Sequence, residues 1–181
     1  MRYALAVLLA LATLATAGVF YPDGATTLHF AFEGSPNGDR PIVRPPAFYA
    51  HDAGFGFVDS PGLIGNANGV QAPKYFRFDV NVPPGTYDVS VRLGSPLVAS
   101  NTTIFAEAHH QMAANIQTAA RGNAVANFTV TVQTSQDPNE KSLDLDDRLT
   151  LEFTGDNPSM MKLDIKPHVA AAAPSPATAP K

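Results

Sequence analysis

The sequence contains no cysteine, so neither a disulfide nor a cysteine nucleophile is available to it. Its fold must therefore be held by the apolar core alone. Charged residues are also few, at 15% of the chain, and the formal net charge is -4. An acidic chain repels a phosphate backbone, and the sequence has no basic stripe or basic-aromatic module. Nucleic acid is accordingly excluded as a partner.

The motifs of a serine hydrolase are missing as well. Such an enzyme needs a serine on a sharp turn, with a histidine and an acid brought to it. The sequence contains no G-x-S-x-G and no Gly-Asp-Ser. Its two Gly-Asp dipeptides, at positions 38 and 155, are followed by Arg40 and Asn157 instead of serine. These absences predict that the chain is not an enzyme and has no catalytic residue.

An apolar run long enough to cross a membrane is also lacking. The only candidate covers residues 4–14, behind Arg2, and is followed by Ala15-Thr16-Ala17, a small-x-small cleavage signal. A spanning helix needs about 20 apolar residues. We therefore expect residues 1–17 to be a signal peptide, the mature protein to be secreted or periplasmic, and no membrane association after cleavage.

What the sequence does contain is a period of two. In "KYFRFDVNV" and "TYDVSVRL" apolar side chains alternate with polar ones, which predicts half-buried strands. The same alternation recurs around Phe30, Phe128, Leu151 and Leu163. Helical patterning is nearly absent, and "HHQMAANIQTAA" is compatible with a short helix or with another strand. Many short strands between Gly, Pro, Asn and Asp turns predict one all-β domain over residues 20–167, an antiparallel β-sandwich or jelly roll.

Two arginines give the first candidate for binding. Pro83-Pro84-Gly85-Thr86 is typical of a type II turn, and a hairpin there would place Arg77 opposite Arg92. The facing pair could then hold an anionic ligand, such as the carboxylate of a uronic-acid polysaccharide, with Tyr75 as a stacking surface. In a jelly roll, however, consecutive strands often belong to opposite sheets, which would separate the arginines.

Aromatic residues of the long irregular region 34–73 give the second candidate. Tyr49, Phe55 and Phe57 can form a platform for sugar rings, because apolar sugar faces stack on aromatic rings. Core packing beneath the loop is the favoured alternative for Phe55 and Phe57.

No cofactor is predicted, and the metal candidates are weak. Glu107 and His109 share a face if residues 101–110 form a strand, and a metal would need a third ligand from elsewhere. His109 is kept as a carbohydrate-binding candidate. The sequence "DLDD" at 144–147 offers oxygen ligands for calcium. It lacks the spacing of a calcium loop, so a carboxylate-rich turn is favoured.

Four stretches together resemble a known domain. "HDAGFGFV", "KYFRFDVNVPPGTYDVSVRLG", "SNTTIFAEAHHQMAANIQT" and "LTLEFTGDNPSMMKLDIKP" are similar, in this order, to the amino-terminal galactose-binding-like β-sandwich of bacterial rhamnogalacturonan acetylesterase-like proteins. These proteins belong to the Gly-Asp-Ser, or SGNH, hydrolase family. The resemblance implies a jelly roll that holds or orients a plant cell-wall polysaccharide, possibly pectic, beside a covalently linked hydrolase domain. No esterase residue has a matching position in this chain.

The favoured interpretation is a non-catalytic, carbohydrate-associated module of a secreted rhamnogalacturonan esterase system. Residues 168–181 are rich in alanine and proline and predict a disordered linker or tail, which would precede the hydrolase domain. One alternative is a fragment of a rhamnogalacturonan acetylesterase. The other is a protein-interaction module with no sugar ligand.

Overall fold

The fold is known from a computed structural model that describes residues 26–33, 43, 45, 47–66, 68–107, 110–133 and 148–169. Strands account for all the regular structure of these residues, and none of them is helical. The strands are β1 (Leu28–Ala31), β2 (Phe55–Val58), β3 (Ile64–Asn66), β4 (Gly69–Gln71), β5 (Tyr75–Asn81), β6 (Gly85–Gly94), β7 (Ser100–Ala106), β8 (His110–Thr118), β9 (Asn123–Val132), β10 (Arg148–Asp156), β11 (Ser159–Met160) and β12 (Lys162–Pro167).

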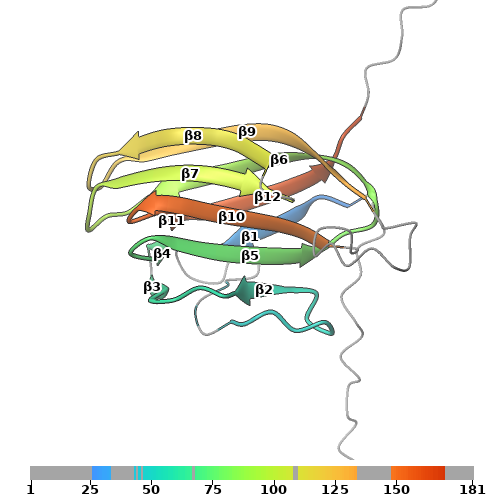
Figure 1. The fold of residues 1–181 in the computed structure, drawn as a ribbon, viewed down its shortest axis with the longest axis horizontal. Helices are drawn as coiled ribbons and strands as arrows, with labels where there is room; N and C mark the ends of the chain where they lie inside the picture. The colour runs from blue at the N-terminus through green and yellow to red at the C-terminus, as the bar shows by residue number, and fades with distance from the viewer. Residues whose placement is uncertain are drawn as a thin grey trace, which may run out of the picture.

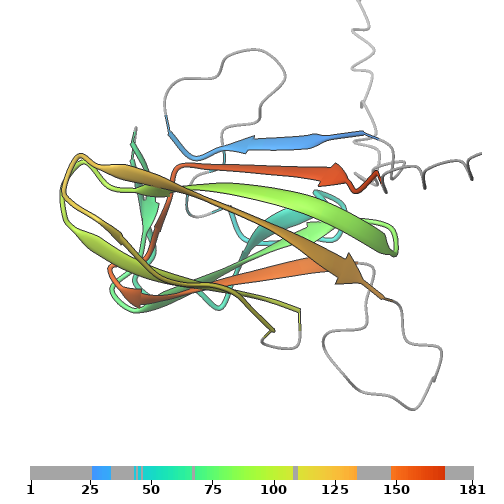
Figure 2. The same ribbon diagram turned by 90° about the horizontal axis from the view of Figure 1, so that it is seen from above.

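Two large antiparallel sheets face each other (Figures 1 and 2). One has the strand order β1-β12-β6-β9 and the other β2-β5-β10-β7-β8, and a small sheet β11-β4-β3 lies at one end. In Figure 2, β1 and β12 lie at the top and β10 on the opposite side. The chain passes from one sheet to the other between β5 and β6 and between β6 and β7. It does so again between β8 and β9 and between β9 and β10, as in a jelly roll. The predicted all-β sandwich is confirmed.

The hairpin predicted across Pro83-Pro84-Gly85-Thr86 is wrong. β5 pairs with β2 and β10, while β6 pairs with β12 and β9, so neither strand has a free edge for the other. Gly85 begins β6 without the positive φ that a type II turn needs. The segment crosses between the sheets, and the Tyr87 hydroxyl donates a hydrogen bond to the Pro83 carbonyl at 2.6 Å.

Phenylalanines fill the space between the sheets. Phe78 of β5 lies 5.5 Å from Phe30 and 5.0 Å from Phe57 between ring centroids, and the rings meet edge to face. The side chains that share this environment, each less than about 3% exposed, are Phe30, Phe32, Phe57, Phe76, Phe78 and Phe153. Phe57 is thus a core residue and does not belong to a sugar platform, as the favoured alternative predicted.

The segment around residues 110–118 is a strand, so its helical alternative is wrong. β8 pairs with β7 along most of its length, and a bulge interrupts the register between Thr102 and Phe105. Asn115 has a positive φ of 52° there, and its backbone N–H donates to the Thr103 hydroxyl at 3.1 Å. This bulge breaks the alternation, which explains why the period of two is blurred in the sequence.

Residues 1–17 and 170–181 lie outside the described residues, so the signal peptide and the Ala/Pro-rich tail stay predictions. Within the described ranges, no helix is long and apolar enough to cross a bilayer.

We predict that Phe78→Ala lowers the free energy of unfolding by about 3–5 kcal/mol, because it leaves a cavity where both sheets meet. The matched control is Phe48→Ala, which removes a ring that is 71% exposed and should change stability by less than about 0.5 kcal/mol. Denaturant unfolding followed by circular dichroism measures both. Equal midpoints for the two variants would contradict the packing described.

Candidate functional site

The outer surface of the five-stranded sheet carries a straight row of side chains. Val58, Arg77, Glu152, Phe105 and Gln111 are successive cross-strand partners on β2, β5, β10, β7 and β8. Their sequence neighbours, such as Phe76, Phe78 and Ile104, are fully buried, so the row points away from the core. Strands lie about 4.8 Å apart, and the row therefore spans about 19 Å. We call this row, together with Tyr75, the five-strand face.

Two half-buried aromatic rings belong to the five-strand face. Phe105 lies between Glu152 and Gln111 and is outside the core cluster. Tyr75 lies two residues before Arg77 on β5, and its hydroxyl donates to Asp59 Oδ2 at 3.3 Å. Partial burial, followed by the negative charge of Asp59, raises the pKa of Tyr75 above its usual value. The phenol therefore stays neutral in physiological conditions.

Arg77 is a cation without an ion-pair partner in the described part of the chain. Its Nε is buried and has no hydrogen-bond partner. None of the ion pairs among the described residues involves it. Glu152 lies directly opposite on β10 and has interactions of its own. A half-buried guanidinium with no ion pair is suited to donate hydrogen bonds to a ligand oxygen.

The predicted pairing of Arg77 with Arg92 is wrong. Arg92 lies on β6, in the opposite sheet, where its direct neighbours are Lys162 and Val125. Its guanidinium lies 3.5 Å from Glu33 Oε1. The core therefore separates the two arginines, as expected of a jelly roll, and Arg92 takes no part in the five-strand face.

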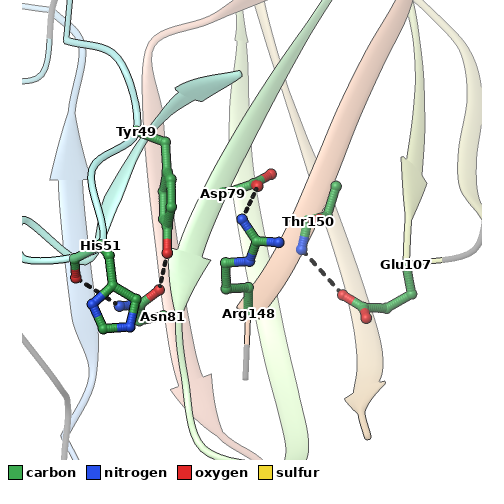
Figure 3. Close-up of polar contacts among 7 residues, drawn as sticks. All are labelled: Tyr49, His51, Asp79, Asn81, Glu107, Arg148 and Thr150. Carbon is green, nitrogen blue, oxygen red and sulfur yellow. Dashed lines mark hydrogen bonds and ion pairs between the residues drawn. The ribbon is translucent and has the colours of Figure 1, made fainter. Parts of the chain in front are cut away.

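A partly buried polar cluster lies at one end of the same sheet (Figure 3). The Tyr49 hydroxyl donates to Asn81 Oδ1 at 2.8 Å, and the Asn81 amide donates to the His51 carbonyl at 3.3 Å. The Arg148 guanidinium lies 5.1 Å from the centre of the Tyr49 ring. Tyr49 is thus engaged in local contacts through both its hydroxyl and its ring face, which makes it a poor sugar platform.

Asp79 is the member of this cluster whose charge is most strongly opposed by burial. Its carboxylate is 2% exposed, and Arg148 Nη1 lies 3.4 Å from Oδ2, while Oδ1 has no hydrogen-bond partner. Burial raises the pKa of Asp79 above its usual value, and the charges of Arg148 and Arg77 offset only part of this effect. The ionised form is therefore less favourable here than in water. On the neighbouring strand, the Thr150 backbone N–H donates to Glu107 Oε1 at 3.1 Å.

Gly56 allows the Tyr49 segment to lie over the sheet. The Tyr49 backbone N–H donates to the Phe57 carbonyl at 3.0 Å. A Cβ on Gly56 would lie 2.3 Å from the Tyr49 nitrogen, which is closer than any real contact. The glycine of the Gly54-Phe55-Gly56-Phe57 motif is therefore required for close backbone approach.

The structure brings together Tyr75 and Arg77 from the predicted site residues. Tyr49 lies at the end of the same sheet, and Phe55 packs its half-buried ring 5.1 Å from Phe30, as expected of core packing. His109 and the 144–147 carboxylates lie outside the described residues. Where the chain is described, no group of three or more histidine, aspartate or glutamate side chains is placed to hold a metal.

Neither Phe105 nor Glu152 stands out as a site residue in the sequence. The sequence left open which side of residues 101–110 is buried, because Ile104 and Ala106 on one face compete with Phe105 on the other. The one signal in the sequence that this side of the strand faces solvent is the charged residue Glu107, which shares the face of Phe105.

Comparison with solved structures finds the same fold in protein YXIM of Bacillus subtilis. The TM-score is 0.57 at 20% identity, over 79% of this chain and 40% of that chain. This chain thus spans less than half of the Bacillus protein. At such identity the likeness shows the fold alone.

Carbohydrate-binding modules are among the other matches. The family 35 module of Paenibacillus barcinonensis has a TM-score of 0.36 at 15% identity, over 64% of this chain and 94% of that chain. The Podospora anserina mannanase with a family 35 module has a TM-score of 0.43 at 12% identity, over 83% of this chain and 29% of that chain. No residue role is carried over from either. No family model and no curated protein matches the sequence significantly.

We predict that Gly56→Ala destabilises the protein by about 1–3 kcal/mol, because the methyl group displaces the Tyr49 segment. Gly85→Ala is the control, since a Cβ there meets nothing closer than 3.6 Å. Thermal unfolding compares the two. A Gly56→Ala variant as stable as Gly85→Ala would refute the close approach.

We predict a pH-dependent gain in stability for Asp79→Asn. Because burial raises the folded-state pKa, the folded protein binds the proton more tightly than the unfolded chain, and stability falls as pH rises through the window above the ordinary value. The asparagine variant lacks this loss, so it should exceed the wild type at about pH 8 and lose that advantage near pH 4.

Asp156→Asn is a control of opposite sign, because the hydrogen bond from Lys74 lowers the pKa of Asp156. That variant should be the less stable one at neutral pH and match the wild type in acid. Melting temperatures across the pH range measure both variants. If the melting temperature of Asp79→Asn instead falls progressively below that of the wild type as pH rises, the ionised carboxylate stabilises the fold and the prediction is wrong.

Proposed function

We propose that this chain is a non-catalytic carbohydrate-binding module that holds a polysaccharide across the five-strand face. The observation that supports this most directly is that Arg77, Glu152 and Phe105 are successive cross-strand partners, while Tyr75 lies two residues from Arg77 on the same strand. Aromatic rings offer apolar surfaces on which sugar rings stack, while a guanidinium and a carboxylate bond sugar hydroxyls. Few other ligands need both kinds of contact in one extended row.

The spacing favours an oligosaccharide over a single sugar. Tyr75 and Phe105 lie on β5 and β7, with β10 between them, so their strands are about 10 Å apart. One sugar ring does not cover both aromatic side chains as well as Arg77 and Glu152. A chain of several sugars laid across the strands does.

The positive charge of Arg77 favours an acidic polysaccharide as the ligand. Its lack of an ion pair among the described residues leaves its guanidinium able to bind a ligand carboxylate. A uronic acid supplies this group, and its neighbouring hydroxyls can bond Glu152. Rhamnogalacturonan, whose backbone carries galacturonic acid, has this chemistry, and the sequence resemblance points to the same pectic class.

The wider setting of the proposal follows from the sequence. A signal peptide at residues 1–17 would deliver the module to the periplasm or the outside of the cell, where plant cell-wall polysaccharide is met. A hydrolase domain linked to it would supply acetylesterase activity, and this chain would hold the substrate. The alternative is that the chain is a fragment of such an esterase. In neither case does the chain itself bring a Gly-Asp-Ser nucleophile.

We predict that the purified chain binds rhamnogalacturonan oligosaccharides, and that Arg77→Ala and Phe105→Ala each weaken binding about tenfold or more. Leu97→Ala, which removes an exposed side chain away from the five-strand face, should bind as the wild type does. Titration calorimetry and affinity gel electrophoresis measure these affinities, with xylan and galactan as comparison polymers.

Absence of binding to all three polymers would refute the carbohydrate-binding proposal. Binding that is unchanged in both Arg77→Ala and Phe105→Ala would place the sugar elsewhere. Hydrolysis of an acetyl ester by the purified chain would refute the proposal that it is non-catalytic.

A further inference from the structure

The outer surface of the four-stranded sheet is hollowed. A cavity of about 420 Å³ opens there, and the side chains that line it include Asp88, Ser90, Asn127, Thr129, Asp164 and Lys166. Asp164, Ser90 and Asn127 are direct cross-strand partners in one row, and Lys166, Asp88 and Thr129 form the next. Ser90 is the shortest side chain at the centre of these rows, so the hollow lies above it. We call this cavity the four-strand hollow.

The four-strand hollow is separate from the five-strand face. β6, β9 and β12 belong to one sheet, and β5, β7 and β10 belong to the other. Figure 2 shows the two sheets as separate layers, and the phenylalanine core lies between them. A ligand in the hollow therefore shares no residue with a polysaccharide bound on the five-strand face.

Side-chain contacts fix the carboxylates at the rim. Asp88 Oδ1 accepts a hydrogen bond from the Thr129 hydroxyl at 3.0 Å and lies 2.8 Å from His168 Nδ1. Asp164 Oδ1 lies 2.6 Å from His29 Nδ1. Asp88 is thereby held in one orientation and retains oxygen lone pairs for a further donor, while Asp164 is held by His29 and has interactions of its own. Such a rim is ordered before a ligand arrives, which reduces the entropy lost on binding.

The polar side chains on the floor of the hollow, by contrast, are not engaged in hydrogen bonds with other described residues. No hydrogen bond of the Ser90 hydroxyl or of the Asn127 amide is found among the described residues. Both groups donate and accept. Fixed acceptors at the rim and unsatisfied donor-acceptor groups on the floor together match a ligand that carries several hydroxyl groups.

Charge decides between a neutral and an acidic ligand. Asp88 and Asp164 are opposed in the hollow by one ammonium group, that of Lys166, which lies 4.0 Å from Asp88 Oδ2. His29 and His168 face the same carboxylates from β1 and from the end of β12. A ligand carboxylate would approach two like charges, whereas hydroxyl groups would donate to them. A volume of 420 Å³ is also within the range of small-molecule pockets.

We propose that the four-strand hollow is a second ligand site, which binds one or two units of a neutral sugar. Ser90 and Asn127 bond its hydroxyl groups from below, and Asp88 and Asp164 accept hydrogen bonds from its edges. The protein then engages carbohydrate on both outer surfaces, an acidic chain on one and a neutral unit on the other.

Nuclear magnetic resonance titration of the labelled chain tests this proposal. The probes are methyl β-galactoside, methyl β-glucoside and galacturonate. We expect one or both neutral glycosides to shift the backbone amides of Ser90 and Asn127, and galacturonate to bind there at least about fivefold more weakly. Arg77→Ala should leave these shifts unchanged, which separates this site from the five-strand face.

Two substitutions of the same type provide the matched variants. Ser90→Gln fills the hollow and should abolish the shifts, while Thr131→Gln lies on the same surface outside the lining and should preserve them. Asn127→Ala should weaken binding about fivefold. No shift at these amides with either neutral glycoside, equal binding by Ser90→Gln, or tighter binding of galacturonate would overturn the proposal. Each of these results leaves binding on the five-strand face untouched.

Discussion

Aromatic packing between the sheets is the constraint on which the remaining structure depends. Without cysteine, no disulfide joins the four-stranded sheet to the five-stranded one. Phe30 and Phe32 project from one side, and Phe57 and Phe78 meet them from the other at centroid distances of 5.2–5.8 Å. Burial of each ring contributes about 1.5–3 kcal/mol. Because the inward positions of every strand are fixed by this contact, the outward positions are fixed as well.

The period of two predicted which side chains enter the core but not which sheet they enter from. Phe76, Phe78 and Val80 alternate with polar residues whatever their neighbours are, so the strand and its buried side were readable from the sequence. Pairing partners are set by segments far apart in the chain, such as β5 with β10. The Pro-Pro-Gly segment carried the composition of a tight turn, and only the occupied edges of both strands show that it is a crossover.

The same limit explains what was and was not foreseen of the candidate site. Tyr75 and Arg77 were expected on a polar surface and lie on one. Glu152 and Phe105 join them through the register of β10 with β5 and β7, which no local pattern encodes. Tyr49 carried the right chemistry for sugar stacking, but its ring lies against Arg148 and its hydroxyl is bonded to Asn81. Those contacts come from residues 32 and 99 positions away in the sequence.

The alternation of the strands also has an evolutionary consequence. In β5 and β6, the positions that build the interior never coincide with those that build the two outer surfaces. Substitutions that alter ligand preference on either surface therefore leave the packing that maintains the fold largely intact. Selection can diversify one surface, erase it or retune it while the other is preserved. A scaffold of this kind is suited to repeated recruitment for new ligands without a matching loss of foldability.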